Sequence, residues 1–255
     1  MKKIIIANWK MNPDSPRSAL RLANEVGRGV KDVKGVGVVL TPPFIFLSPV
    51  SSSMSRVAGL KLGAQDVFWE KAGAYTGEVS SLQLRALGVR FVVVGHSERR
   101  ALGETDEMVA KKVKAVLESG MRPVLCIGEK EKEKDIAFPN IIRDELHHGL
   151  KNVKKTTLKN LIIAYEPVWA ISTNKRAVAD NPQNVYEMTI LIRRELYRMF
   201  GKRIASQMPI LYGGSVNEKN AASFVKGGGV DGLLVGGASL SSSKFVKIVE
   251  QVADL

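Results

Sequence analysis

Short runs of apolar, mostly β-branched residues recur along the chain, and each is followed by a turn and then by a segment with helical spacing of its apolar positions. Continuous apolar runs of this length are typical of strands that are buried on both faces, as in a parallel sheet covered by helices. The pattern predicts eight strands, over residues 4–8, 36–41, 60–65, 91–95, 123–127, 161–165, 210–213 and 232–236.

Helix-capping residues mark three of the intervening segments. Ser15 before Pro16 and Asn181 before Pro182 each combine an N-cap side chain with a proline in the first turn. Thr105 precedes two acidic residues, which favour the positive end of a helix dipole. These signals predict helices that begin near residues 16, 106 and 182.

The alternation of strands and helices indicates βαβ units, and eight such units in about 250 residues match a closed barrel. The predicted fold class is therefore α/β, a single-domain (β/α)8 TIM barrel of eight parallel strands ringed by helices. No linker or break in composition interrupts residues 1–255, so we expect one domain. The alternative is an open doubly wound sheet, but no predicted strand runs into a Gly-x-Gly-x-x-Gly sequence.

Composition limits the classes of function. The single cysteine, Cys126, has no partner for an internal disulfide, and three histidines without a Cys/His cluster predict no metal site. The chain contains no run of about 18 apolar residues, and its first apolar run is too short for a signal peptide. We therefore expect a cytoplasmic protein without a membrane partner.

The formal net charge of +13 favours anionic partners. Acidic residues are interleaved with the basic ones, and the densest basic stretch, residues 151–159, contains no aromatic side chains, so a nucleic-acid partner is not expected. We interpret the excess charge as solvated helix faces whose field draws in an anionic small molecule.

Three polar side chains follow predicted strands at the end where barrel enzymes carry their chemistry. Glu166 precedes the apolar segment 167–171, which can fold over the carboxylate and exclude water from it. A carboxylate in such a place can act as a general base. His96 precedes a predicted short helix, whose N-terminus favours a neutral ring that donates to a substrate oxygen. Lys10, two residues after Asn8, would stabilise an anionic intermediate. The alternatives are a structural ion pair for Glu166, a structural histidine and a surface lysine.

Glycine pairs follow the last two predicted strands. Strand seven runs into Gly213-Gly214-Ser215, and strand eight runs into Gly236-Gly237. Glycine-rich loops at these two places form a recurrent phosphate site in barrels, because their backbone N–H groups can approach an anion closely. The alternative is two tight turns. No Walker A sequence is present, so nucleoside triphosphates are not implied.

Seven segments spread in order over nearly the whole chain resemble the triosephosphate isomerase family. They are residues 7–12 (ANWKMN), 73–78 (GAYTGE), 94–100 (VGHSERR), 126–129 (CIGE), 164–171 (AYEPVWAI), 212–216 (YGGSV) and 231–240 (DGLLVGGASL). The resemblance implies interconversion of dihydroxyacetone phosphate and D-glyceraldehyde 3-phosphate through an enediolate, in glycolysis and gluconeogenesis, with no cofactor and no metal. Another phosphate-binding barrel enzyme would share the glycine loops without the lysine, histidine and glutamate segments.

The resemblance also assigns a role to each site residue. It implies Glu166 as the base, His96 as a neutral electrophile and Lys10 as the stabiliser of the anion. The implied substrate-binding residues are Asn8, Lys10, Ser172, Ser215, Gly236 and Gly237. The implied supporting residues around them are Glu98, Arg99 and Cys126. In the family, a lid closes over the substrate and is held by a latch. The resemblance implies that Pro167, Trp169, Asn174 and Tyr212 belong to the lid and its latch.

Two features of the resemblance bear on assembly and on the lid. Thr76 lies in a segment that in the family inserts into a neighbouring subunit, which implies a homodimer. The usual lid has glycine at the positions of Ser172 and Asn174, and both glycines are absent. We therefore expect retained chemistry with altered lid kinetics, while a noncatalytic barrel kept for binding is the alternative.

Overall fold

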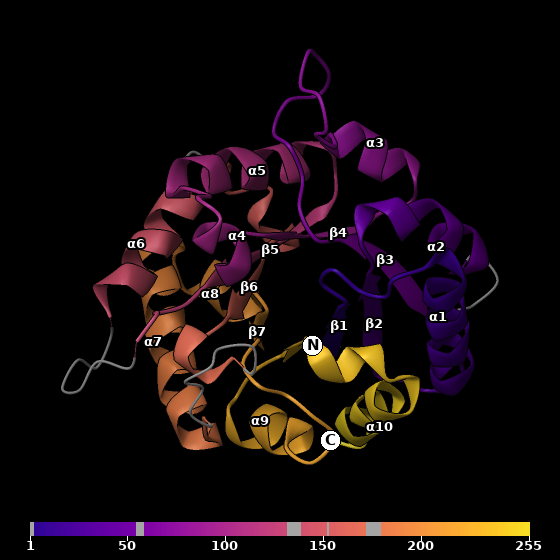
Figure 1. Cartoon of the computed structure of the whole chain (residues 1–255). Coiled ribbons are helices and arrows are strands. Elements are labelled where there is room, and N and C mark those ends of the chain that lie inside the picture. The colour runs from indigo at the N-terminus through magenta and orange to yellow at the C-terminus, as the bar shows by residue number, and fades with distance from the viewer. Residues whose placement is uncertain (1–2, 55–58, 132–138, 152, 172–179) are drawn as a thin grey trace.

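The computed structural model describes residues 3–54, 59–131, 139–151, 153–171 and 180–255 (Figure 1). The strands lie at its centre, and helices form a ring around them (Figure 1). The strands are β1 (Lys3–Asn8), β2 (Val36–Thr41), β3 (Leu60–Ala64), β4 (Phe91–Val94), β5 (Arg122–Ile127), β6 (Ile162–Tyr165), β7 (Ile210–Tyr212) and β8 (Gly232–Val235).

The strands form a closed parallel barrel in sequence order. Each strand pairs with the next one, and β8 pairs with β1 in a register that places Ile4 opposite Gly232. A Cβ at Gly232 would lie 1.8 Å from the carbonyl oxygen of Ile4, so only glycine fits at this closing pair. The predicted barrel is confirmed, the open-sheet alternative is wrong, and every predicted strand boundary lies within one residue of the observed one.

Apart from the amino ends of some strands, both faces of each strand are buried, and this explains the apolar runs. Ile4 and Ile6 belong to the cluster that fills the barrel interior, whereas Ile5 between them belongs to the cluster beneath the helices. Because side chains alternate along a strand, an apolar residue is needed at every position when both faces are covered.

The helices that ring the barrel are α1 (Pro16–Val30), α2 (Leu47–Met54), α3 (Ser81–Ala86), α4 (Ser97–Ala101), α5 (Asp106–Glu118), α6 (Asn140–Gly149), α7 (Pro182–Phe200), α8 (Lys202–Gln207), α9 (Ala221–Gly227) and α10 (Ser242–Ala253). Single-turn 3-10 helices are η1 (Phe44–Phe46), η2 (Leu158–Asn160), η3 (Val168–Ala170) and η4 (Gly237–Leu240). The sequence did not predict α8, which follows α7 directly after Gly201 takes a φ of 85°.

The three predicted caps are confirmed. The side chains of Ser15, Thr105 and Asn181 each accept a hydrogen bond from the backbone N–H three residues later. Each bond satisfies one of the N–H groups that a helix leaves unpaired at its start. The caps therefore fix where α1, α5 and α7 begin.

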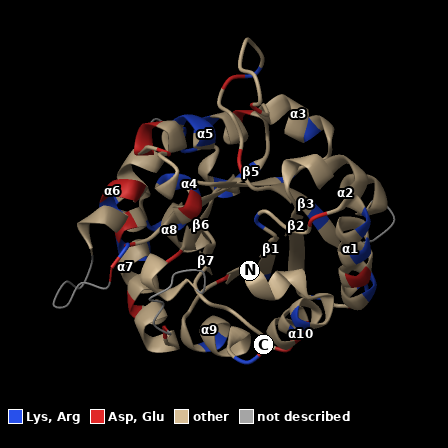
Figure 2. Cartoon of the chain, viewed as in Figure 1, with Lys and Arg blue, Asp and Glu red and all other residues tan. Residues whose placement is uncertain are grey.

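Charged residues are spread around the ring of helices. Figure 2 shows acidic positions among the basic ones over most of the outer helices. Among the described residues, no helix is long and apolar enough to cross a membrane.

Candidate active site

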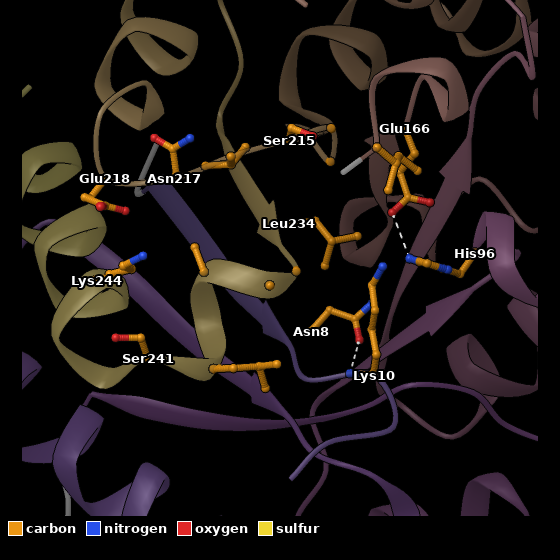
Figure 3. Close-up of a pocket in the computed structure, with 18 residues that line it drawn as sticks. Asn8, Lys10, His96, Glu166, Ser215, Asn217, Glu218, Leu234, Ser241 and Lys244 are labelled. Atoms are coloured by element: carbon orange, nitrogen blue, oxygen red, sulfur yellow. Dashed lines mark hydrogen bonds and ion pairs between the residues drawn. The ribbon is translucent and has the colours of Figure 1, made fainter. Parts of the chain in front are cut away.

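A cavity of about 470 Å³ opens at the carboxyl ends of the strands. Figure 3 shows Asn8, Lys10, His96 and Glu166 together on one side of it, with Glu218 and Lys244 on the other. Seven of the residues predicted to bind or transform substrate line this one cavity: Asn8, Lys10, His96, Glu166, Ser215, Gly236 and Gly237. Closure of the barrel thus brings together the ends of β1, β4, β6, β7 and β8.

Lys10 is held in an unusual backbone conformation at the end of β1. Its φ of 55° is the only positive value of a non-glycine residue in the described part of the chain. The Lys10 N–H donates to Asn8 Oδ1 at 3.1 Å, and the Lys10 carbonyl accepts from Gln65 Nε2 at 2.8 Å. Such backbone strain persists only where neighbours hold it. The result is a lysine ammonium fixed in the cavity, where it contacts Glu98 Oε1 at 2.6 Å.

The hydrogen bonds of His96 define its tautomer. His96 is the N-cap of α4, and its Nδ1 accepts a hydrogen bond from the Glu98 N–H at 3.2 Å. A backbone N–H only donates, so Nδ1 carries no proton and the ring hydrogen lies on Nε2. This Nε2–H faces Glu166 Oε1 at 3.3 Å. The first turn of α4 therefore engages Nδ1 and leaves Nε2 directed toward Glu166 in the cavity.

Glu166 is only 2% exposed, although it lies at the mouth of the barrel. Its N–H donates to the carbonyl of Ile127 at 2.8 Å, which anchors its backbone to the end of β5. Its Oε2 accepts no hydrogen bond from any described residue. A buried carboxylate oxygen without a donor is a strong acceptor, because no other group competes for its lone pairs.

Gly213 controls the space beside Glu166. A Cβ at this position would lie 2.7 Å from Glu166 Cγ, so Gly213→Ala is expected to push the carboxylate aside. A displacement near 1 Å costs about a hundredfold in rate, and we expect kcat to fall by at least about tenfold with a folded barrel. Steady-state kinetics and circular dichroism check this. The matched control is Gly37→Ala in β2, where the nearest atom would lie 3.7 Å away; equal losses in both variants would contradict the explanation.

The two glycine pairs meet the cavity in different ways. Gly236 lies beside Lys10, because a Cβ there would be 3.4 Å from Lys10 Cε. Gly237 begins η4, and a Cβ on it would meet no atom within 4 Å. The N-terminus of η4 therefore lies against open space, where its N–H groups can reach an anion.

Ser215 is engaged within the protein. Its hydroxyl and its N–H both donate to the carbonyl oxygen of Ala170, at 2.7 and 3.1 Å. These bonds tie the loop after β7 to η3. In this conformation Ser215 holds the segment that follows Glu166, so a bond from its N–H to a phosphate would require it to release Ala170.

Glu129 forms hydrogen bonds with residues on both sides of Glu166. Its Oε1 accepts from Trp169 Nε1 at 2.6 Å and from the Tyr165 hydroxyl at 3.0 Å. Burial raises the pKa of Glu129, while the hydrogen bond from Trp169 opposes this shift. Pro167 begins the turn, and the Val168 N–H donates to the carbonyl of Glu129 at 2.9 Å. The residues on both sides of Glu166 are thus fixed to the loop after β5.

The remaining predicted residues surround the cavity at different distances. Glu98 reaches Lys10, but Arg99 Nε contacts Asp66 at 3.0 Å and does not line the cavity. Cys126 is buried in the barrel interior, and burial, with the nearby Glu166 charge, raises the pKa of its thiol. Tyr212 donates its hydroxyl to Asp180 at 3.3 Å, and burial followed by that carboxylate raises the Tyr212 pKa.

Three further predictions concern assembly and the lid. Thr76 is exposed on the loop after β3, which protrudes from the barrel (Figure 1). Ser172 and Asn174 lie outside the described residues, so the expectation of altered lid kinetics stays a prediction.

No role was predicted for Gln65 or Glu145, which lie outside the lining of the cavity. Gln65 follows a strand directly, which is the signal that could have found it, and it also donates to the Thr41 carbonyl at 2.8 Å. Glu145 lies on α6, where no sequence signal separates it from a surface glutamate. It is buried, it accepts from the Gly128 N–H at 2.9 Å, and it lies 3.3 Å from Arg100 Nε.

Glu145 gives the fold a pH dependence. Burial raises its pKa to about 7, against an opposing effect of Arg100. A carboxyl group whose pKa is raised in the folded protein stabilises the fold fully at pH values below its pKa in the unfolded chain. This stabilisation is lost as the pH rises through its pKa in the folded protein. The Glu145→Gln variant cannot ionise at this position, so its stability should not show this loss. Between pH 4.5 and 7.5, the free energy of unfolding of the wild-type protein should therefore fall by about 3 kcal/mol relative to that of the variant.

Urea unfolding of both proteins across this pH range measures the difference. Glu187→Gln provides the control, since Glu187 is an exposed helical glutamate on α7. A constant difference between wild type and Glu145→Gln across the range would contradict the assignment.

Among the described residues, no group of three or more His, Cys, Asp or Glu side chains is arranged to hold a metal ion. The side chains at the mouth form an acceptor, a donor and a cation around a cavity that both glycine loops also line. This set suits removal of a proton from a carbon next to a carbonyl group, because the resulting oxyanion would face both the donor and the cation.

Comparison with known proteins gives matches over nearly the whole chain. The family model described as triosephosphate isomerase matches residues 3–252. The chain is 43% identical over 251 residues to the triosephosphate isomerase of Thermoanaerobacter pseudethanolicus, covering 97% of this chain and 98% of that protein. It is 42% identical to that of Carboxydothermus hydrogenoformans, covering 98% of each, and 41% identical to that of Dehalococcoides mccartyi, covering 99% and 98%.

Proposed function

Because the chain belongs to the triosephosphate isomerase family and so interconverts triose phosphates, we propose that Glu166, His96 and Lys10 carry out the proton transfer of that reaction. The observation that carries this proposal is the contact of His96 Nε2 with Glu166 Oε1 at 3.3 Å, in a cavity that both glycine loops also line. No cofactor is needed, since a base, a donor and a cation supply the whole reaction.

The proton would travel through Glu166. The carboxylate takes a proton from the carbon next to the carbonyl of dihydroxyacetone phosphate, and the electron pair moves onto the carbonyl oxygen to give an enediolate. The Nε2–H of His96 donates to that oxygen. Return of the proton from Glu166 to the former carbonyl carbon, with movement of a hydroxyl proton between the two oxygens, gives glyceraldehyde 3-phosphate. The buried Oε2, which accepts no hydrogen bond from a nitrogen or oxygen donor of the described residues, supports Glu166 as the base.

The charges of the substrate would be held at two places. Lys10 lines the cavity, where its ammonium would stabilise the enediolate, with Asn8 beside it. The phosphate would lie against the N–H groups of Gly236 and Gly237, with Ser215 joining when it leaves Ala170. Fixing both ends of a small substrate places its reacting carbon against Glu166, which is how positioning contributes to rate.

An assay with a coupled dehydrogenase, run on glyceraldehyde 3-phosphate in D₂O, tests this assignment. The reaction should show turnover and should incorporate solvent deuterium at the carbon that receives the proton, because Glu166 can exchange with water between the two transfers. Zero turnover would indicate a noncatalytic barrel, and turnover in Glu166→Gln equal to wild type would exclude Glu166 as the base.

We also propose that the chain forms a homodimer and works in the cytoplasm. Loops that follow neighbouring strands at the mouth expose large apolar side chains: Met11 at 93%, Ile45 at 78%, Tyr75 at 46% and Leu102 at 79%. An exposed apolar surface of this kind is typical of a protein interface. Thr76 lies beside Tyr75 on the protruding loop, which would contact the second subunit.

Replacement of one apolar side chain by a charge should separate the subunits. Ile45→Asp is expected to weaken the dimer by at least about thirtyfold, the effect of losing a central interface residue. Light scattering coupled to size-exclusion chromatography measures the mass. Ile190→Asp is the matched control, since Ile190 is 48% exposed on α7 on the outside of the barrel. A wild-type monomer, or equal dissociation of both variants, would overturn the proposal.

A further inference from the structure

A second cavity, of about 520 Å³, lies at the end of the barrel opposite to the mouth. It is formed at the amino ends of β3, β4 and β5, by residues that precede β4, β5 and β6, and by α2. It shares no lining residue with the cavity at the mouth. Any ligand bound there would leave the catalytic cavity accessible.

Three cationic side chains line this second cavity. Lys61 comes from β3, Arg90 directly precedes β4, and Arg122 begins β5. No aspartate or glutamate is among the lining residues that the structure describes, and none of the three cations forms an ion pair with a described residue. This differs from the outer helices, where lysines such as Lys111 and Lys114 pair with glutamates. The cavity therefore has a positive potential without internal compensation.

Phe91 gives the cations a fixed platform. This side chain is 3% exposed and belongs to the cluster that fills the barrel interior. Lys61 Nζ lies 5.8 Å from the centroid of its ring, and Arg122 Cζ lies 5.3 Å from the same centroid. Cation–π contacts hold both charged groups near one rigid residue and so lower the entropy lost when they bind a common anion.

Arg122 is the most constrained of the three. It is half-buried, its Nε donates to the carbonyl of Asn160 at 3.2 Å, and burial lowers its pKa from the ordinary value. A guanidinium keeps its charge at neutral pH despite such a shift. A partly desolvated cation without a carboxylate partner is costly, and an anion that joins it recovers the lost interaction.

We propose that this cavity binds a small multivalent anion bearing phosphate groups, held by Lys61, Arg90 and Arg122. Arg122 would supply paired N–H donors to phosphate oxygens, and Lys61 on β3 would neutralise a further oxygen. The cavity is larger than a single phosphate group requires, so the ligand has room for more than one anionic group. Binding would link β3, β4 and β5 and would stabilise the folded protein by mass action.

Titration with inorganic pyrophosphate tests the site directly. In an ¹⁵N spectrum of arginine side chains, the Nε–Hε signal of Arg122, assigned with Arg122→Lys, should shift saturably. Lys61→Met should raise the midpoint by about tenfold, the effect of losing one charge-assisted hydrogen bond. Its kcat/KM on triose phosphates should stay at the wild-type value, because Lys61 lies outside the catalytic cavity.

The control variant is Lys114→Met, which makes the same change of charge on α5. It should leave the midpoint unchanged, and sodium chloride at matched ionic strength should give no saturable shift. An unchanged midpoint in Lys61→Met, an equal change in Lys114→Met, or a shift that follows ionic strength alone would overturn the proposal.

Discussion

Glu166→Asp is expected to lower kcat by about a hundredfold while KM stays within a few-fold of wild type. The shorter side chain withdraws the carboxylate from the position that faces His96 Nε2 at 3.3 Å, but it keeps the charge and the backbone bond to Ile127. If the glycine loops and Lys10 bind the substrate as proposed, binding should be retained, so the loss should fall on the chemical step. Steady-state kinetics in both directions measure it.

Glu218→Asp is the matched control for this variant. Glu218 lines the same cavity on the side opposite to Glu166, so the shortening is the same but the base is untouched (Figure 3). Its kcat should stay close to wild type. A Glu166→Asp enzyme with near-wild-type kcat would be incompatible with Glu166 as the base.

Lys10→Met should lower kcat/KM by between about a hundred- and a thousandfold, because it removes a preorganised charge from the place where the enediolate oxygen develops. The loop conformation should survive, since Gln65 and Asn8 hold the backbone of Lys10 and not its ammonium. The loss should therefore appear without a loss of thermal stability, which calorimetry measures beside the kinetics.

Lys244→Met separates a local effect from a general one. Lys244 lines the other side of the same cavity on α10, so its removal changes the net charge equally. We expect less than about a tenfold change in kcat/KM, as for a charge that steers the substrate without contacting the reacting atoms. Equal losses in the two variants would mean that Lys10 acts only through the overall field.

The sequence predicted the fold closely because local and global signals agree. Most strands are apolar runs, because burial on both sides in a barrel demands apolar residues wherever both faces are covered. An exception is β3, which has the exposed Lys61 near its amino end. The helix starts followed from Ser15, Thr105 and Asn181 for the same reason, since an N-cap bond depends only on residues three apart. The rule that chemistry lies at the carboxyl ends of strands then selected the side chains that line the mouth.

Contacts between distant segments were not predictable in this way. The engagement of Ser215 with Ala170, the support of Lys10 by Gln65 and the buried position of Glu145 depend on side-chain packing across the closed barrel. The positive φ of Lys10 also had no signal, because lysine rarely adopts it and nothing local requires it. Glu145 illustrates the limit, since its α6 sequence would suit a solvated helix equally well.

The pairing of the last strand with the first affects how activity arises during synthesis. Lys10 lies at the end of β1, yet its neighbour Gly236 follows β8 and is made more than two hundred residues later. A nascent chain that lacks β8 has neither a closed barrel nor the second glycine loop, so we expect activity to appear only once that strand has left the ribosome. Two complementary fragments, divided between β6 and β7, should each be inactive. Recovery of isomerase activity after the fragments are mixed would measure closure of the barrel.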